Sequence, residues 1–247
     1  MKNSLTISTP FFNEEDGLNF YFKVIKKINI FFKKKKINLN FLFINDGSND
    51  QTLQKLKYFK KKNKQFKILI YNHGVNQGYG KTLINSIKKS KSKFLITYDS
   101  DCTYDHRLIY KIYSKAIKES FDIINVSYKL YSIKNTISFS RSLLSFLSNL
   151  TYDLFFKEVR RYKITVYTCS FRIYNLAKIK KIKLYSHNFN CCAELLIKSM
   201  LKGLKIAEIP GKYIGRKYGH SKMKIFKNII SSILTIFKIK IETLKFS

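Results

Sequence analysis

The sequence contains few residues of several types, and each shortage removes a class of protein from consideration. Its 247 residues include no tryptophan, two prolines and only 15 acidic side chains. Its four cysteines (residues 102, 169, 191 and 192) form no C-x-x-C pair, which argues against a disulfide framework or a common zinc site. Residues 1–12 (MKNSLTISTPFF) contain no hydrophobic signal-peptide segment. We therefore expect free thiols, as in a reducing cytosol.

Positive charge, in contrast, is abundant. Lys and Arg total 48 against 15 Asp and Glu, giving a formal net charge of +33. Such a surface attracts nucleic acid, anionic lipid headgroups or phosphorylated substrates. Heavy use of Asn, Ile, Lys, Phe and Tyr, whose codons are AT-rich, explains the same charge through genome composition. Charge alone therefore does not choose a partner, whereas the 45% hydrophobic content indicates a folded globular domain.

Short apolar segments alternate with helix-length segments in the first half of the chain. Strands are expected at residues 5–9, 41–45, 66–71, 94–98 and 121–127, with helices at 18–32, 50–62, 79–89 and 107–118. This alternation predicts an α/β fold with a mostly parallel central sheet and helices on both faces. Further along, we expect a long apolar helix at 136–156, an extended segment at 163–174, a helix at 190–201, a strand at 204–210 and a Gly-rich basic loop at 211–223.

The tail, residues 224–247, has the pattern of an amphipathic helix. Its apolar residues recur at a spacing of three or four, and most of its lysines fall elsewhere around the helix. Its longest uncharged run, 228–237, is too short to span a bilayer, which takes about 20 apolar residues. The tail either lies in the headgroup region of a membrane, together with the apolar segment 136–156, or packs on the core of the domain.

Two acidic residues follow one of the expected strands, in KFLITYDSDCTYDH (residues 93–106). Asp99 and Asp101 point to the same side of an extended chain, just beyond the carboxyl end of a strand, where open α/β sheets bind ligands. Two carboxylates there repel unless a cation lies between them, and Mg²⁺ or Mn²⁺ suits hard oxygen ligands and substrate phosphates. A surface turn with solvated acids explains the same residues. Cys102 and His106 also permit zinc, at a spacing that matches no common site.

Acidic residues follow two other expected strands as well. In FINDGSNDQT (residues 43–52) the chain turns, and Asn49 or Asp50 is placed to cap the next helix. Asp46 is placed to accept a hydrogen bond from a base or ribose at the edge of the sheet. The stretch TPFFNEED (9–16) repeats the arrangement with Glu14 and Glu15.

Taken in order, these motifs resemble the GT-A family-two glycosyltransferases, and within them the polyprenyl-phosphate branch of the dolichol-phosphate mannose synthase type. The family's P-x-Y-N-E-E reads PFFNEE at 10–15, its D/N-D-G-S-x-D-x-T reads NDGSNDQT at 45–52, its N-x-G is NQG at 76–78, and its D-x-D is DSD at 99–101. Later come a helix led by Glu194, GLKIAEIP at 203–210 and RKYGHSK at 216–222. The resemblance covers most of the chain.

Some positions depart from the pattern of that branch. Its D-x-T-C/S-G-F-R reads VYTCSFR at 166–172, so Val166 and Ser170 replace Asp and Gly. Thr103 stands where a Gln often joins the metal shell, and the usual G-S-R is degraded around residues 126–128.

The resemblance implies a GT-A domain over residues 1–223, followed by an amphipathic helix over 224–247 that contacts a membrane interface. It implies inverting, metal-dependent transfer of a sugar from GDP-mannose or a UDP-hexose to a dolichyl or undecaprenyl phosphate. The implied cofactor is Mg²⁺ or Mn²⁺ on Asp99 and Asp101. The implied partners are the nucleoside-diphosphate sugar, the polyprenyl phosphate and an anionic membrane surface, with no nucleic acid. The implied location is peripheral, on the cytoplasmic face of a membrane, in cell-envelope synthesis.

The resemblance also assigns roles to individual residues. A phosphate monoester is a dianionic nucleophile that needs positioning cations rather than a general base. The catalytic residues would be Asp99, Asp101, Arg216 and Lys222. The donor would be held by Pro10, Phe12, Glu14, Asp46, Gly78 and Lys81. The acceptor phosphate would be held by Arg141, Arg172, Arg216, Ser221 and Lys222.

Three alternatives remain open on the sequence. The same fold could transfer sugar to a sugar hydroxyl in surface-polysaccharide synthesis, which needs a base such as Asp153 or Glu194. A basic nucleic-acid-binding protein would explain the lysine runs 33–36 and 60–62, although no recognition module is present. The changes at Val166 and Ser170 are also consistent with a transferase that has kept the fold and lost turnover.

Overall fold

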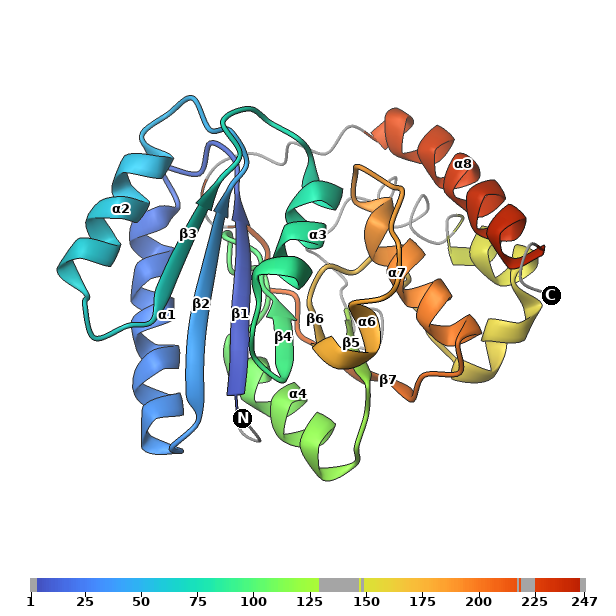
Figure 1. The fold of residues 1–247 in the computed structure, drawn as a ribbon, viewed down its shortest axis with the longest axis horizontal. Coiled ribbons are helices and arrows are strands. Elements are labelled where there is room, and N and C mark those ends of the chain that lie inside the picture. Colours follow the sequence, from blue (N-terminus) through green and yellow to red (C-terminus); the bar gives the residue numbers. More distant parts are fainter. Residues whose placement is uncertain (1–3, 129–146, 148, 217, 219–224, 245–247) are drawn as a thin grey trace.

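The computed structural model describes residues 4–128, 147, 149–216, 218 and 225–244. Its centre is a seven-stranded sheet with the order β3-β2-β1-β4-β6-β5-β7 (Figure 1). The strands are β1 (Ser4–Phe11), β2 (Asn38–Asn45), β3 (Ile68–Asn72), β4 (Phe94–Thr97), β5 (Ile123–Ser127), β6 (Arg172–Asn175) and β7 (Ile206–Pro210). The helices are α1 (Leu18–Lys34), α2 (Thr52–Lys62), α3 (Tyr79–Lys89), α4 (Arg107–Lys118), η1 (Lys157–Tyr162), α6 (Leu176–Ile179), α7 (Asn190–Leu201) and α8 (Ile225–Leu244).

The strand directions confirm the mostly parallel sheet. β1 pairs in parallel with β2 and β4, β2 with β3, and β5 with β7. The exception is β6, which lies antiparallel between β4 and β5. It falls within the segment expected to be extended, but only residues 172–175 form a strand. Apolar patterning indicates burial and carries no strand direction, so the sequence did not predict this reversal.

Helices cover both faces of the sheet, as predicted, because side chains alternate along each strand. In β4, Phe94 and Ile96 point into a core shared with α1, α2 and α4. Leu95 points into a second core shared with α3, α7 and α8. Three expected helices, α3, α4 and α7, begin and end at the predicted residues.

The segments after β5 are the least regular. Residues 149–155 are helical and η1 follows, which agrees with the end of the helix expected at 136–156. The earlier part of that prediction, residues 136–146, lies outside the described residues. α8 packs through Ile236 and Ile239, which are 1% and 0% exposed, onto the second core. One face of the tail is therefore part of the fold.

Within the described part of the chain, no helix is both long enough and apolar enough to cross a bilayer.

Candidate active site

The site predicted from the acidic motifs lies at the carboxyl ends of β1 and β4, which are neighbours in the sheet. From β1 the chain continues to β2 on one side, and from β3 it returns to β4 on the other side (Figure 1). The order of strands therefore reverses between β1 and β4. Ligands of open α/β sheets bind outside the carboxyl ends at such a reversal. Glu14 follows β1 here, and Asp99 and Asp101 follow β4.

Asp99 and Asp101 lie close enough to interact electrostatically. Burial, and then the negative charge of Asp101, raise the pKa of Asp99 to about 7. Asp99 Oδ2 accepts a hydrogen bond of 2.5 Å from Ser170 Oγ, and Asp101 Oδ1 accepts one of 3.2 Å from the backbone N–H of Thr103. Ser170, a departure from the pattern expected of the polyprenyl-phosphate branch, is thus a direct partner of the acid pair, a contact that glycine could not make.

Arg216 joins the carboxylates that follow the two strands. Its Nε donates to Asp101 Oδ2 at 3.1 Å, and its Nη2 donates to Glu14 Oε1 at 2.8 Å. All three side chains are mostly buried: Arg216 is 20% exposed, Asp101 is 19% exposed and Glu14 is 12% exposed. A guanidinium from the late basic loop therefore lies between two acidic residues of the site.

The segment after β7 positions Arg216. The backbone N–H of Ile214 donates to the carbonyl oxygen of Thr103 at 2.7 Å. Tyr104 and Tyr213 form an antiparallel bridge, and their rings meet edge to face at 5.8 Å. These contacts fix the chain beside the loop that carries Asp101, so the side chain of Arg216 reaches the acids.

The loops after β1 and β2 are tied together by reciprocal hydrogen bonds. The backbone N–H groups of Asn13 and Glu14 donate to Ser48 Oγ at 2.9 Å and to Thr52 Oγ1 at 2.8 Å. The N–H of Asn49 donates in return to Asn13 Oδ1 at 2.8 Å. The two acidic motifs thus form one structural unit, which holds the backbone of Glu14 in place.

Asp46, expected to contact a base or ribose, forms its hydrogen bonds with other groups of the protein. It is 5% exposed, and its carboxylate bonds His73 Nδ1 at 2.6 Å and the backbone N–H groups of Gln77 and Gly78 at 2.9 Å each. His73 Nε2 lies 2.7 Å from the amide nitrogen of Asn85, so Nε2 accepts from Asn85 and Nδ1 donates to Asp46. Asp46 therefore shapes the loop before α3. No motif in the sequence singled out His73.

The other expected donor residues surround this loop and β1. Pro10 lies near the end of β1, paired with Ile44, and Phe12 is partly buried directly after the strand. Gly78 has a φ of 84°, and any side chain there would overlap the carbonyl oxygen of His187. Lys81 is exposed in the first turn of α3.

Arg172 lies in the core, not at a surface where an acceptor phosphate could bind. It is 0% exposed. Its Nε donates to Asn125 Oδ1 at 2.5 Å, and its two other nitrogens donate to the carbonyl oxygens of Cys192 and Tyr167. We therefore correct the expectation for Arg172 and leave it out of the site. Arg141, Ser221 and Lys222 lie outside the described residues.

Both residues considered as a general base are held by protein donors. Glu194 is 1% exposed, and its carboxylate accepts from the backbone N–H of Ser186 at 2.9 Å and pairs with Lys198 Nζ at 2.9 Å. Asp153 Oδ1 accepts from the hydroxyl of Tyr167 at 2.6 Å. Neither contact joins the acid pair at the end of β4.

The donor atoms of the acid pair fit a hard divalent cation. Among the described residues, no group of three or more His, Cys, Asp or Glu could hold a metal by itself. A cation at Asp99 and Asp101 would therefore take further oxygen ligands from water and substrate phosphates, as Mg²⁺ and Mn²⁺ commonly do. Zinc is disfavoured, because burial raises the pKa of the Cys102 thiol to about 12 and so opposes formation of the thiolate ligand.

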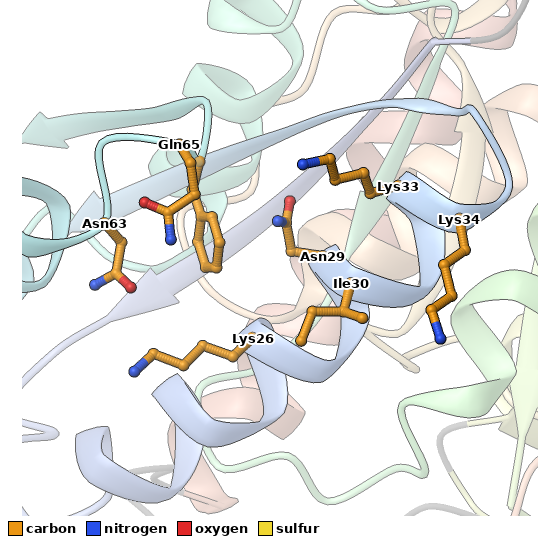
Figure 2. Close-up of a pocket in the computed structure, with 8 residues that line it drawn as sticks. Lys26, Asn29, Ile30, Lys33, Lys34, Asn63 and Gln65 are labelled. Carbon is orange, nitrogen blue, oxygen red and sulfur yellow. The ribbon is translucent and has the colours of Figure 1, made fainter.

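A hollow of about 560 Å³ on the surface lies away from these residues (Figure 2). Figure 2 shows lysine side chains around it that extend from α1. It is lined by Lys26, Asn29, Ile30, Lys33, Lys34, Asn63, Gln65 and Phe66. The lysine runs at 33–36 and 60–62 include the last turns of α1 and α2, where basic residues favour the helix dipole. None of the expected site residues lines this hollow.

Comparison with known protein families shows which family the chain belongs to. The sequence profile described as Glycosyl transferase family 2 matches residues 6–183. This chain belongs to glycosyl transferase family 2. The match includes the acidic motifs after β1, β2 and β4 and ends before α7. The chain is therefore a glycosyltransferase by family.

Relatives of this family 2 glycosyltransferase occur in archaea and cyanobacteria. An uncharacterised protein of Methanocaldococcus jannaschii is 25% identical over 243 residues, covering 96% of this chain and 91% of the relative. An uncharacterised glycosyltransferase of Synechocystis is 27% identical over 188 residues, 74% of this chain and 54% of the relative. This chain thus spans about half the length of the Synechocystis protein.

Solved structures share the fold of the family 2 chain. Glucosyl-3-phosphoglycerate synthase from Mycobacterium tuberculosis, in complex with Mn²⁺, UDP and glucosyl-3-phosphoglycerate, has a TM-score of 0.68 at 13% identity, covering 95% of this chain and 77% of that one. Residues 1–349 of TarS from S. aureus give a TM-score of 0.57 at 16% identity, covering 83% and 58%. At these identities the likeness establishes the GT-A fold alone.

Proposed function

We propose that this glycosyltransferase transfers a hexose from a nucleoside-diphosphate sugar to a polyprenyl phosphate, with inversion and with Mg²⁺ or Mn²⁺ as cofactor. The observation that carries the proposal is the contact of Arg216 with Asp101 and Glu14. This contact brings a cation of the late basic loop next to the acid pair, where the strand order reverses. The donor diphosphate would need carboxylates that hold its cation, and the anionic acceptor would need a positive side chain beside them.

The donor half of the proposal is supported by the acid pair and by the fold neighbours. Mycobacterial glucosyl-3-phosphoglycerate synthase is described in complexes with Mn²⁺ and UDP or UDP-glucose. In this chain, Asp99 and Asp101 would hold the cation, which would neutralise the departing diphosphate. The stretch from Pro10 to Glu14 and the loop from Gly78 to Lys81 would flank the nucleoside, with Asp46 holding that loop in shape.

The acceptor half of the proposal rests on whether the attacking group of the acceptor needs a general base. A phosphate monoester is largely dianionic near neutral pH, since its second pKa is about 6, and it needs no general base. A sugar hydroxyl needs one, and the carboxylates of Asp153 and Glu194 already accept hydrogen bonds within the protein. Arg216 would bind the acceptor phosphate, with Arg141, Ser221 and Lys222 as further candidates. This arrangement favours a phosphate over a hydroxyl acceptor.

A lipid acceptor would place the protein at a membrane, and we propose peripheral attachment at the cytoplasmic face. α8 lies beside the segment containing residues 149–155, and the rings of Phe155 and Phe237 are 6.4 Å apart (Figure 1). Apolar side chains that are 40–59% exposed gather on these two segments: Leu147, Leu150, Leu154, Phe155, Ile233, Leu234, Phe237 and Ile241. We call this set the apolar face. Exposed apolar surface of this kind, flanked by lysines such as Lys238, fits an anionic bilayer.

The test supplies radiolabelled UDP- and GDP-sugars, Mn²⁺ and a polyprenyl phosphate, and measures label in the organic phase. We expect label in the lipid, its loss with EDTA, and a fall of about 100-fold or more for Asp101→Asn. Asp105→Asn is the matched control, because Asp105 lies in the same loop and pairs with the exposed Arg107. Label that enters only a water-soluble glycan would instead establish the hydroxyl-acceptor alternative.

A further inference from the structure

The Arg216 side chain binds Asp101, one of the two carboxylates that would bind the cation, so Arg216 and the cation would compete for it. Its guanidinium bridges Glu14 and Asp101, which follow different strands. Charged hydrogen bonds between partly buried groups are stronger than exposed ion pairs. Asp101 already uses Oδ1 to accept from Thr103 and Oδ2 to accept from Arg216. A divalent ion at the acid pair must therefore share with Thr103 or Arg216 an oxygen of Asp101, and in either case it lies next to the carboxylate that holds Arg216.

Electrostatics makes this sharing unfavourable. A doubly charged ion at Asp101 and the guanidinium of Arg216 would repel one another across one carboxylate. Gly215 precedes Arg216 with a φ of 80°, and among the described residues a side chain built at Gly215 would meet nothing within 4 Å, which gives the backbone at this point freedom to turn. A turn of the backbone at Gly215 would move the guanidinium away from Asp101 while Ile214 keeps its backbone bond to Thr103.

We propose that Arg216 is a cation-operated latch: it neutralises Asp101 and Glu14 in the metal-free protein, and cation binding at the acid pair releases it to bind the acceptor phosphate. This inference rests on the proposed function and adds to it a coupling between cation and acceptor. By linkage, cation and phosphate acceptor each raise the affinity for the other. Cation binding, which brings the donor diphosphate with it, therefore raises the affinity of the site for the acceptor.

The test is a Mn²⁺ titration followed by electron paramagnetic resonance, without nucleotide and with UDP or GDP. We expect Arg216→Gln to bind Mn²⁺ about 5-fold or more tightly than the wild-type protein, since its competitor for Asp101 is gone. Arg107→Gln is the matched control. It removes the same charge near the same loop, from a side chain that is 83% exposed and paired with Asp105 at 2.5 Å. Solvent screens that charge, so we expect its Mn²⁺ affinity to stay within about twofold of wild type.

A second measurement uses the wild-type protein and does not depend on the folding of a variant. Phenylglyoxal modifies accessible guanidinium groups, and mass spectrometry of the peptide containing Arg216 gives the rate of modification. We expect Mn²⁺ to accelerate the modification of Arg216 and to leave that of Arg107 unchanged. Farnesyl phosphate added with Mn²⁺ should then protect Arg216 again.

The outcomes separate the latch from the proposed function. If the wild-type protein binds Mn²⁺ and Arg216→Gln binds it no more tightly than Arg107→Gln, the latch is overturned while the metal site stands. Modification of Arg216 that is unchanged or slowed by Mn²⁺ overturns it too. If no form of the protein binds Mn²⁺ under any of the conditions, the acid pair is not a cation site, and both proposals fail.

Discussion

Asp99 shows how a single side chain sets the conditions under which the site works. Its environment, chiefly burial and the nearby Asp101, raises its pKa to about 7, and the hydroxyl of Ser170 opposes this by donating to the carboxylate. Near neutral pH, a proton would therefore compete for Asp99 with the cation proposed at the acid pair. Ser170, which departs from the pattern of the polyprenyl-phosphate branch, favours the ionised form that would bind this cation.

This competition predicts a pH dependence of metal binding. Because a carboxylate binds a cation and a carboxylic acid does not, we expect Mn²⁺ affinity to rise as the pH increases from about 5 through 7 and to level off above about 8. Ser170→Ala removes a hydrogen bond to the ionised form, so its rise should occur at higher pH. The measurement is a series of Mn²⁺ titrations across this range.

The control for this series is Ser199→Ala, which removes another buried serine hydroxyl, one that bonds the carbonyl oxygen of Leu195 within α7. Its pH profile should match that of the wild-type protein. A Mn²⁺ affinity that does not change between about pH 5 and 8, or a profile that Ser170→Ala moves to lower pH, contradicts the interpretation.

At the scale of elements, the start of α3 depends on a close approach between two backbones. The N–H of Gly80 donates to the carbonyl oxygen of His187 at 2.9 Å, and a side chain at Gly80 would overlap the backbone oxygen of Ser186. The same turn carries Gly78, whose N–H is held by Asp46. The loop before α7 therefore fixes the end of the site that would face the donor.

We predict that Gly80→Ala destabilises the protein. Alanine improves helix propensity by about 1 kcal/mol, but overlap with a backbone oxygen cannot be relieved by rotating a side chain and costs about 1–3 kcal/mol or more. We expect a net loss of about 1–2 kcal/mol in the free energy of unfolding, measured by urea denaturation. Gly74→Ala, where a side chain would meet no described residue within 4 Å, should stay within about 0.5 kcal/mol of wild type. Equal stability of the two variants would refute the packing argument.

At the scale of the whole molecule, the proposed membrane attachment would use the positive charge and the apolar face together. The net charge of +33 supplies long-range attraction to an anionic surface, and salt screens it. The apolar face supplies short-range binding that salt does not weaken. A protein that uses both should prefer anionic to neutral vesicles and should keep part of its affinity at high salt.

Vesicle binding tests this combination. Leu234→Glu with Phe237→Glu places two charges on the apolar face, and we expect at least tenfold weaker binding to phosphatidylglycerol-containing vesicles, since burial of each side chain contributes about 1.5–3 kcal/mol. Ile30→Glu is the control, because Ile30 is 56% exposed on α1 and lies outside the apolar face. Sedimentation with vesicles gives the affinities. Equal losses for the two proteins would leave the apolar face without a role in membrane binding.

The α/β fold class and the parallel pairing of most strands, but not the reversed β6, followed from local patterns. Alternating apolar strands and helix-length segments require crossover helices, and these impose parallel strands. Acidic motifs directly after β1, β2 and β4 then had to meet at one edge of the sheet. Order along the chain was therefore enough to predict that Glu14, Asp46, Asp99 and Asp101 follow strands whose carboxyl ends share one edge.

The tertiary structure alone decided which partner each of these charges has. Arg216 reaches Asp101 and Glu14 across 115 and 202 positions of sequence. Packing likewise buried Arg172 in the core and brought Asp46 within hydrogen-bond distance of His73. Periodicity reports which face of an element is buried, because that depends on neighbours within a few residues. The pairing of a guanidinium with one carboxylate rather than another depends on distances between segments that only the folded chain brings together.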